Sequence, residues 1–425
     1  MGRLRLLRDS AAGHTQPAWR CEDSRVAELI PIAEARRRVL DAVEQLPGEA
    51  VPLARALGRV LAEDVTSGID VPGFDNSAMD GFAVVAGPPA ELRVVGESRA
   101  GHPSTVGVRQ GTAVRISTGA QVPEGADAVV PVERTETRDG GVRVPATDTG
   151  ANVRRAGEDV RSGDVVLRAG TPFGPAEVGV LASLGKSRVL CAGSPRVALL
   201  VTGDELVEPG GSLGPGRVFS SNGYALAGQV GRAGGELVTS ESVPDAAEET
   251  RSALERAIAD ADVVCVSGGV SVGPHDHVKA ALGELGAEER FWGVSLKPGK
   301  PTWFGTAGRV LVFGLPGNPV SAMVTFHLFA RPALRALQGA DPRESRAGAV
   351  LDEALPRNPR RDQAVRCRLR VGADGWHAAP TGDQGSHVLT SMLGAHALAL
   401  LPAGEGELAA GERVEIELLD SGSIP

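Results

Sequence analysis

The feature that most constrains the fold of this chain is a set of three apolar runs that each end in a polar, glycine-bearing loop. The runs are 196–201 (RVALLV), 262–266 (DVVCV) and 310–315 (VLVFGL), and their loops are 202–205 (TGDE), 267–273 (SGGVSVG) and 316–321 (PGNPVS). Short, β-branched runs bounded by glycine and proline predict strands. In an open α/β sheet, ligands bind beyond the carboxyl ends of the strands. The stretch 195–322 therefore predicts a sheet with a pocket at one edge.

Helical patterns alternate with these strands. Helices are expected at 223–232, 245–259, 276–285 and 319–337, further strands at 236–243 and 290–296, and an edge segment near 302–305. Asp245 followed by Glu248 has the spacing of a capping box, which predicts that Asp245 caps its helix. Alternation of this kind predicts a doubly wound, three-layer α/β domain with a parallel sheet over 194–338.

The rest of the chain divides into units of a different pattern. Short apolar runs broken by glycine and proline predict a β domain inserted at 68–149 and a second small β domain at 339–425. The flanking segments 26–67 and 150–193 predict one discontinuous, mixed α/β linker domain, and residues 1–25 are expected to form a flexible extension. The fold class is therefore multidomain α/β.

Length and charge exclude several classes of protein. A chain of 425 residues is long enough for several domains. Its net charge of −9 does not favour nucleic acid or an anionic membrane as a partner. No uncharged apolar run reaches the roughly 20 residues of a membrane span. The four cysteines contain no CxxC pair, which favours a reducing compartment, and we expect the protein to be cytoplasmic.

Two of the three loops carry groups that suit an anion. In the second loop, Ser267, Gly268, Gly269 and Ser271 precede a helix, and backbone amides at a helix start favour negative charge. A tight strand-to-helix turn without a ligand explains this loop equally well. In the third loop, Asn318 suits a helix N-cap and Pro319 a first helical position, so structure alone explains much of it.

Charged residues in other loops suggest ligands of two kinds. Lys297 and Lys300 stand on a loop stiffened by prolines, which indicates an oxyanion or phosphate partner, although lone lysines are usually solvated. Four carboxylates stand in glycine-flanked loops and suit Mg²⁺, although each alone is more typical of a turn: Asp80, Asp159, Glu205 and Asp276. The chain has no HExxH, GxSxG or DxDxDG motif, so zincin, α/β-hydrolase and EF-hand functions have no support.

Seven motifs in one order are more specific than any one of them. They are PGFDNSAMDGFAV (72–84), RISTGAQVPEGADAVVPVE (115–133), RRAGEDV (154–160), VTGDEL (201–206), SGGVSVG (267–273), KPGKP (297–301) and GLPGNPVSA (314–322). Together they resemble the molybdopterin molybdenumtransferase family, which also includes the C-terminal domain of gephyrin. The resemblance runs from about Leu29 to the C-terminus.

The resemblance implies a fold and an activity. Members of this family look like elongated homodimers of four-domain subunits, with each pocket shared between the sheet domain of one subunit and the β domain of its partner. They insert molybdenum from molybdate into adenylylated molybdopterin in a Mg²⁺-dependent step that releases AMP, the last step of molybdenum cofactor biosynthesis. The expected partners are an upstream molybdopterin adenylyltransferase and downstream molybdoenzymes.

The resemblance also implies roles for individual residues. Asp80 (supplied in trans), Asp159, Lys297 and Lys300 are expected to be catalytic, and Glu205 and Asp276 to hold Mg²⁺. The expected substrate-binding residues are Ser77, Thr118, Gly119, Thr202, Gly203, Asp204, Ser267, Gly268, Gly269, Ser271, Pro298, Gly299, Pro316, Gly317, Asn318, Pro319, Ser321, Arg366 and Ser386.

This chain departs from the family at four positions. Ser220 and Pro274 stand where an acid is frequent, Gly223 where an arginine is common, and Gly293 where a lysine is common. These departures leave a non-catalytic molybdopterin-binding or scaffold protein as an alternative. A third alternative is molybdopterin adenylyltransferase, because the sheet domain resembles that enzyme too.

Overall fold

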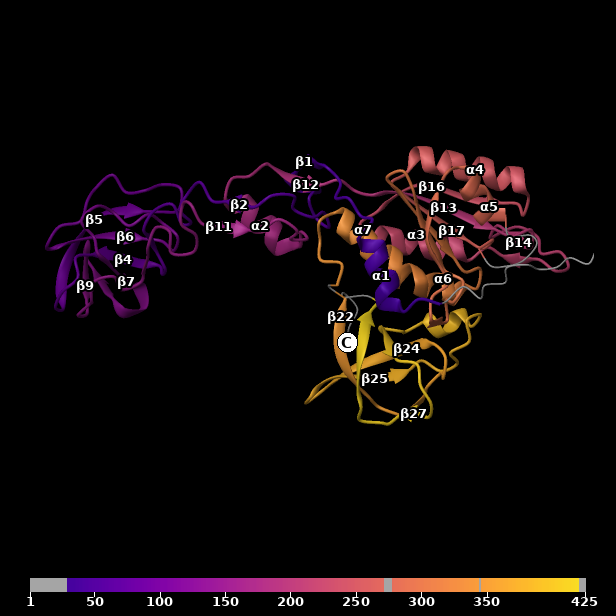
Figure 1. Ribbon diagram of the computed structural model, residues 1–425. Helices are drawn as coiled ribbons and strands as arrows, with labels where there is room; N and C mark the ends of the chain where they lie inside the picture. Colours follow the sequence, from indigo (N-terminus) through magenta and orange to yellow (C-terminus); the bar gives the residue numbers. More distant parts are fainter. Residues whose placement is uncertain (1–28, 271–276, 344, 420–425) are drawn as a thin grey trace, which may run out of the picture.

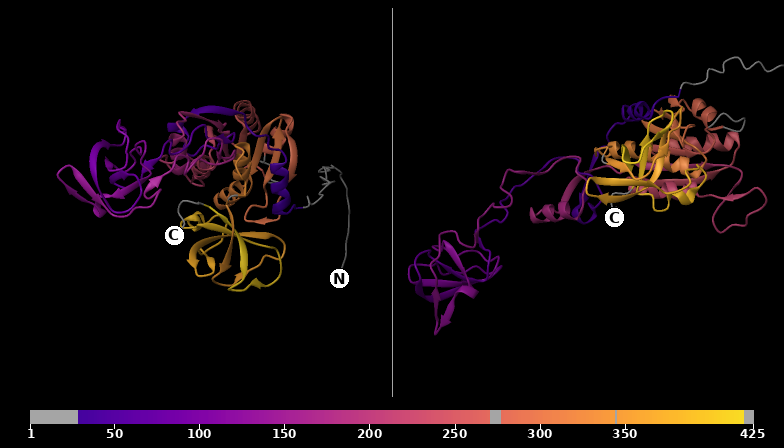
Figure 2. Two further views of the ribbon diagram at one scale, coloured as in Figure 1. Left: turned by 90° about the vertical axis from the view of Figure 1, so that its left-hand side faces the viewer. Right: turned by 90° about the horizontal axis from the view of Figure 1, so that it is seen from below.

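The computed structural model describes residues 29–270, 277–343 and 345–419. The molecule is elongated: a β domain lies at one end, a thin linker follows, and the sheet domain and C-terminal domain lie together at the other end (Figures 1 and 2). The predicted fold class, multidomain α/β with two small β domains, is confirmed. In the part of the chain that the structure describes, no helix is both long and apolar enough to cross a membrane.

A six-stranded sheet forms the centre of the sheet domain. Its order is β16-β13-β17-β21-β20-β18, and the first four strands are parallel. The parallel prediction fails at one edge: the hairpin turn at 308–309 makes β20 antiparallel to β21, and β18 pairs with β20 in the antiparallel sense as well. The strands are β13 (Arg196–Thr202), β16 (Glu236–Val243), β17 (Val263–Ser267), β18 (Glu288–Trp292), β20 (Trp303–Ala307) and β21 (Val310–Leu315).

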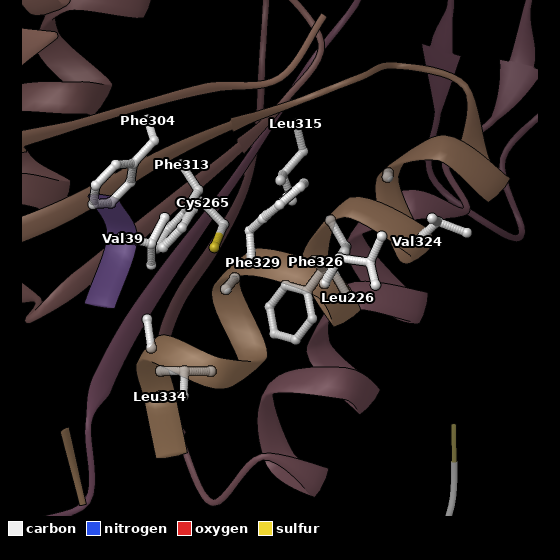
Figure 3. Close-up of a cluster of buried hydrophobic side chains, with 14 of the residues drawn as sticks. Val39, Leu226, Cys265, Phe304, Phe313, Leu315, Val324, Phe326, Phe329 and Leu334 are labelled. Atoms are coloured by element: carbon white, nitrogen blue, oxygen red, sulfur yellow. The ribbon is translucent and has the colours of Figure 1, made fainter. Parts of the chain in front are cut away.

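Helices cover both faces of this sheet and give three layers. Val197 and Leu199 of β13 face one cluster of buried side chains, and Ala198 and Leu200 face the other, as the two-residue period of a strand requires. Figure 3 shows the first cluster, with Phe326 and Phe329 packed beside the sheet. The helices are α3 (Asn222–Arg232), α4 (Ala247–Asp260), α5 (His277–Glu284), α6 (Pro319–Thr325) and α7 (Arg331–Leu337). A buried π-helical turn, η3 (Phe326–Ala330), joins α6 to α7.

The predicted cap of α4 is wrong. The helix begins at Ala247 after Ala246, and no side chain caps it. Asp245 instead pairs with the first loop: its amide donates to Asp204 Oδ1 (3.1 Å), and the Asp204 amide donates to Asp245 Oδ2 (3.4 Å). The side chains of Asp204 and Asp245 therefore connect the end of β13 to the end of β16.

The first helix, α1 (Ile32–Leu40), lies in the sheet domain rather than in the linker, where the sequence had placed it. Ile32, Ala35 and Val39 recur every three or four residues and join the buried cluster of the sheet domain. Arg36 fixes the helix further, since its Nη2 lies 2.5 Å from Glu417 Oε1 in a buried ion pair and its Nε donates to Leu328 O (3.1 Å).

The linker and the inserted β domain follow in order along the long axis. In the linker, β1 pairs with β12 and β2 with β11, both antiparallel. The β domain has a six-stranded sheet of order β7-β4-β6-β5-β9-β8. Linker elements are β1 (Gly48–Pro52), η1 (Leu53–Arg55), β2 (Val65–Thr66), β11 (Val165–Leu167), α2 (Pro175–Ser183) and β12 (Arg188–Ala192). The β domain contains β3 (Asn76–Ser77), β4 (Gly81–Val84), β5 (Ala90–Ser98), β6 (Thr112–Ile116), β7 (Ala128–Pro131), η2 (Val132–Arg134), β8 (Glu136–Arg138), β9 (Gly141–Val144) and β10 (Val153–Arg154).

The C-terminal domain is a small barrel. Strands pair in the order β24-β25-β22-β28-β26, and β26 pairs with β24 to close the ring. One further strand, β19 (Leu296–Lys297), comes from the sheet domain and pairs with β24. The remaining elements are β14 (Leu206–Val207) and β15 (Val218–Phe219) beside the first loop, and β22 (Arg346–Leu351), β23 (Leu355–Pro356), β24 (Asp362–Gly372), β25 (Gly375–Pro380), η4 (Leu389–Met392), β26 (Ala397–Leu401), β27 (Glu407–Leu408) and β28 (Arg413–Leu418).

Candidate active site

The three predicted loops meet at the carboxyl edge of the sheet. Their strands β13, β17 and β21 are adjacent and parallel, so their carboxyl ends share one edge. The Gly268 amide donates to Leu315 O (3.0 Å), and Ser267 Oγ donates to Pro316 O (3.3 Å). A Cβ at Gly268 would lie 2.6 Å from Thr202 Oγ1, so only glycine fits between the first and second loops.

A cavity of about 580 Å³ opens at this junction. Seven predicted site residues line it: Thr202, Glu205, Ser267, Pro316, Gly317, Asn318 and Pro319. Gly203, Asp204, Gly268 and Gly269 lie in the same loops, outside the lining. Ser321 is buried inside α6, where its carbonyl accepts a hydrogen bond from Thr325 Oγ1 (2.8 Å). The volume falls within the range of small-molecule sites.

Sequence reasoning missed the residue that ties the loops together. Asn222, at the start of α3, donates from Nδ2 to Ser267 Oγ (2.8 Å) and to Gly317 O (2.8 Å). It lines the cavity and is 8% exposed. A polar residue at a helix start is typical of a cap, so its position gave no separate signal of this bridging role.

One hydroxyl of the cavity wall has no partner. Thr202 Oγ1 is buried and makes no hydrogen bond in the structure. A buried polar atom without a partner costs about 1–3 kcal/mol, and native proteins contain few of them. The hydroxyl is covered by the second loop, because a Cβ on Gly268 or Gly269 would lie 2.6 Å or 3.1 Å from it.

The metal prediction rests on Glu205. Glu205 is exposed and lines the cavity. The pKa of nearby Asp245 is raised, first because its carboxyl group is partly buried and then because of the negative charges of Asp204 and Glu205. Among the described residues, no group of three or more His, Cys, Asp or Glu is arranged to hold a metal ion. Asp276, with Ser271 and Pro274, lies outside the described residues. One carboxylate fits Mg²⁺ all the same, because this ion keeps several waters and binds substrate phosphate.

The lysine loop joins the sheet domain to the C-terminal barrel. Lys297 and Lys300 are exposed, whereas Pro298 and Gly299 between them are buried. Thr302 Oγ1 donates to Gly299 O (2.7 Å), and the Val294 amide donates to Lys300 O (3.0 Å), which fixes the loop backbone. Pro301 next to it lines the cavity, so two cationic side chains start from a rigid segment at its rim.

The C-terminal domain also reaches the third loop. Asn318 Nδ2 donates to Ser386 Oγ (2.9 Å), so the predicted Ser386 lies beside the cavity. Arg366 is fully buried, and its guanidinium donates to the carbonyls of Asp383, Gln384 and Gly385 and to Ser391 Oγ. The expected direct contact of Arg366 with a ligand is therefore corrected, because burial places its side chain behind the loop that carries Ser386.

Five predicted site residues lie far from the cavity of their own chain. Ser77, Asp80, Thr118 and Gly119 belong to the β domain, and Asp159 lies at the junction of linker and β domain; Figure 1 shows this domain at the opposite end of the molecule. The Thr118 amide (2.7 Å) and hydroxyl (3.1 Å) donate to Asp80 Oδ1, which lowers the pKa of Asp80. Asp159 is exposed and has a backbone bond to Val71 O (3.0 Å).

Three of the four departures lie within the described residues. Ser220 is 3% exposed and lines the cavity, and Gly223 follows one residue beyond Asn222 in α3. Gly223 and Ser220 also line a second hollow of about 340 Å³ next to the cavity. Gly293 has a φ of +89°, and a Cβ there would lie 2.8 Å from Leu29 Cδ2. A side chain at Gly293 would thus be strained in this chain.

Family models match most of the chain. Residues 30–185 match the model described as MoeA N-terminal region (domain I and II), residues 198–336 a probable molybdopterin binding domain, and residues 348–419 the MoeA C-terminal region (domain IV). The matches cover the linker, both β domains and the sheet domain.

Individual proteins give the same result. The chain is 37% identical over 403 residues to the molybdopterin molybdenumtransferase of Haemophilus influenzae, covering 92% of this chain and 98% of that protein. It is 35% identical over 404 residues to the protein of that name from Bacillus subtilis, covering 92% and 94%. A crystal structure of the molybdopterin biosynthesis MoeA protein from Pyrococcus horikoshii matches with a TM-score of 0.79 and 32% identity, covering 92% of this chain and all of that one.

Proposed function

Because the chain belongs to the molybdopterin molybdenumtransferase family, we propose that it is a transferase that inserts molybdenum from molybdate into adenylylated molybdopterin and releases AMP. The observation that carries this proposal is the cavity at the shared carboxyl edge, which the glycine-bearing loops line and which the lysine loop borders through Pro301. Both proposed substrates are anions with several oxygen atoms, and this rim offers them cations and hydrogen-bond donors.

The residues of the cavity suit cleavage of a phosphoanhydride. Such a reaction depends on positioning and on neutralisation of developing charge more than on a covalent nucleophile. Lys297 and Lys300 supply positive charge on a fixed backbone, and Ser386 adds a hydroxyl from the C-terminal domain. Asn222 joins the second and third loops, so this wall of the cavity is already in place before substrate arrives.

We propose Mg²⁺ as the cofactor. Glu205 and Asp276 would hold it. When bound, Mg²⁺ would neutralise charge on the phosphate oxygens of the substrate. Ser220, which stands where relatives often carry an acid, contributes a neutral oxygen to the same cavity.

We propose a homodimer in which the β domain of one subunit completes the cavity of the other. Asp80 supports this because Thr118 holds its carboxylate ionised and oriented, yet it lies at the opposite end of its own chain from the cavity. A carboxylate that is held ionised at the far end of its own chain suits a site on a second copy. Asp159, Ser77 and Gly119 would arrive with it.

The cytoplasm is the proposed location. Cys191, Cys265 and Cys367 are buried free thiols, as suits a reducing compartment. An upstream molybdopterin adenylyltransferase would supply the substrate, and molybdoenzymes would take the product.

A reconstitution assay tests the activity. Purified protein is mixed with adenylylated molybdopterin, molybdate and Mg²⁺, and both AMP release and activation of an apo-molybdoenzyme are measured. We expect both signals to require the protein. No activity above a no-protein control, from protein shown to be folded, would contradict the proposal.

The neutral Ser220 and the side-chain-free Gly223 favour one alternative, a molybdopterin-binding or scaffold protein without turnover. It predicts molybdopterin binding with no AMP release, and an Asp80→Asn variant that behaves like the wild type. Consumption of ATP with molybdopterin in the same assay would instead identify an adenylyltransferase.

A further inference from the structure

A tryptophan at the edge of the central sheet reaches the second loop. Trp292 is the last residue of β18, and its indole Nε1 donates a hydrogen bond to Val270 O (2.9 Å). Val270 is the last residue of the second loop that the structure describes, and the first residue of this loop, Ser267, lines the cavity at the sheet edge. An indole has one donor and no acceptor, so this hydrogen bond satisfies the only polar group of the side chain.

The same indole contacts the helix that follows the second loop. Lys279 of α5 places its Nζ 4.6 Å from the centroid of the Trp292 ring, which is a cation–π contact. Glu289 of β18 holds the lysine there, because Glu289 Oε2 lies 3.4 Å from Lys279 Nζ. Trp292 therefore contacts the chain on both sides of residues 271–276, with its N–H on one side and its ring face on the other.

The second loop is closely packed between Ser267 and Val270. The Gly268 amide donates to the carbonyl at the end of β21 (3.0 Å). Gly269 has a φ of +64°, and a Cβ there would lie 2.7 Å from a side chain of α5. Val270 is 2% exposed, and a Cβ on Gly314 would lie 2.6 Å from Val270 Cγ1. Because every residue of this stretch is in close contact, a shift of Val270 should move the stretch back to Ser267.

Trp292 also begins the segment that carries the lysine loop. Directly after it, the Gly293 amide donates to Thr302 O (2.9 Å) and the Val294 amide donates to Lys300 O (3.0 Å). The backbone that follows Trp292 is therefore bonded to the backbone of the lysine loop. One side chain thus joins the second loop to the segment that leads into the lysine loop, and both loops carry groups that suit the oxygen atoms of an anionic substrate.

We propose that Trp292 is a positioning residue of the active site, which fixes the second loop against the segment that leads into the lysine loop. This role rests on the proposed transferase function, since it assigns both loops to one anionic substrate. Trp292 is absent from the described residues that line the cavity, so it acts through Val270. Loss of its N–H should weaken binding of the ground state and of the transition state alike, and so change KM more than kcat.

Two variants that lose the same atoms test this role. Trp292→Phe keeps an aromatic face for Lys279 but has no N–H for Val270 O. Trp303→Phe is the matched control, because Trp303 pairs with Trp292 across the two strands and its Nε1 donates to Glu289 Oε2 (2.7 Å) instead of to a loop.

Calorimetry without molybdate measures the affinity of the full chain for adenylylated molybdopterin, and the AMP assay measures kcat. Trp292→Phe should bind roughly fivefold more weakly than the wild type, with kcat within about twofold. Trp303→Phe should stay within about twofold of the wild type in both quantities. Thermal unfolding confirms that each variant is folded. Unchanged affinity in Trp292→Phe, or an equal loss in Trp303→Phe, would overturn the proposal.

Hydrogen exchange in the ligand-free protein tests the same role without substrate. The Gly268 amide should exchange at least roughly threefold faster in Trp292→Phe than in the wild type or in Trp303→Phe, because the loop opens more often. Unchanged exchange at Gly268 in Trp292→Phe would overturn the role of Trp292. Wild-type protein that binds adenylylated molybdopterin but releases no AMP would instead contradict the proposed transferase activity alone.

Discussion

The Asn222 side-chain amide lies 2.8 Å from Ser267 Oγ, and this hydrogen bond joins the start of α3 to the end of β17. The same Nδ2 donates to Gly317 O in the third loop. One buried amide thus sets the separation of two loops that line the cavity.

Removal of this amide should loosen the cavity. In Asn222→Ala, Ser267 Oγ and Gly317 O lose their donor inside a buried site, which should lower the free energy of unfolding by about 1–3 kcal/mol. AMP release should fall at least roughly tenfold, because the loops are no longer held at a fixed distance. Denaturant unfolding and the AMP assay measure the two effects. Ser221→Ala, a neighbour with no capping hydrogen bond, is the stability control and should stay within about 0.5 kcal/mol of the wild type.

Replacement of Thr202 should separate stability from binding. Thr202→Val exchanges the unpartnered hydroxyl for a methyl group of similar size, so the ligand-free protein should be equally stable or more stable. If the hydroxyl contacts substrate, the affinity for adenylylated molybdopterin should fall roughly tenfold. Thermal unfolding and direct binding measure these effects, and unchanged affinity would show that Thr202 Oγ1 stays covered by the second loop when substrate binds.

Arg366 should act through the loop that it supports. Arg366→Met leaves the carbonyls of Asp383, Gln384 and Gly385 without their donors and should destabilise the protein by about 2–4 kcal/mol. Arg368→Met is the matched control, because Arg368 is on the same strand but exposed, and should change stability by less than about 0.5 kcal/mol. A stable Arg366→Met protein with impaired molybdate binding would instead indicate direct ligand contact.

One histidine of the barrel should make stability depend on pH. His377 Nε2 lies 2.7 Å from Asp374 Oδ1 and its Nδ1 3.0 Å from Asp352 Oδ1, and these carboxylates raise the pKa of His377. A raised folded-state pKa means stabilisation that is fully present below the unfolded value of about 6.5 and lost as pH rises through the folded value. NMR titration should give a His377 midpoint above about 6.5, and Asp374→Asn should lower it. A midpoint below the unfolded value would contradict this arrangement.

The sequence predicted the sheet better than the contacts between units. Strand β21 was expected at 310–315 and lies there, because a β-branched run between turn residues has few other solutions. The placement of α1 was missed, since the spacing of Ile32, Ala35 and Val39 identifies a buried face but not its partner. Likewise, the alternation of β24 does not say that Arg366 points inward, because buried arginines are rare and need partners from a distant loop.

The shared active site gives the sharpest prediction. Asp80→Asn and Glu205→Gln should each abolish activity when expressed alone. If Asp80 acts in trans, a heterodimer of the two variants contains one cavity with both changes and one cavity with neither. When the two variants are expressed in equal amounts, half of the dimers are heterodimers, and each heterodimer has one intact cavity out of two. Roughly one quarter of wild-type AMP release should therefore return. If both residues act within one chain, every cavity carries one change and no activity returns. To remove the dependence on the mixing ratio, AMP release is measured on the heterodimer alone, purified through a different tag on each subunit. Roughly half the wild-type rate is expected from it.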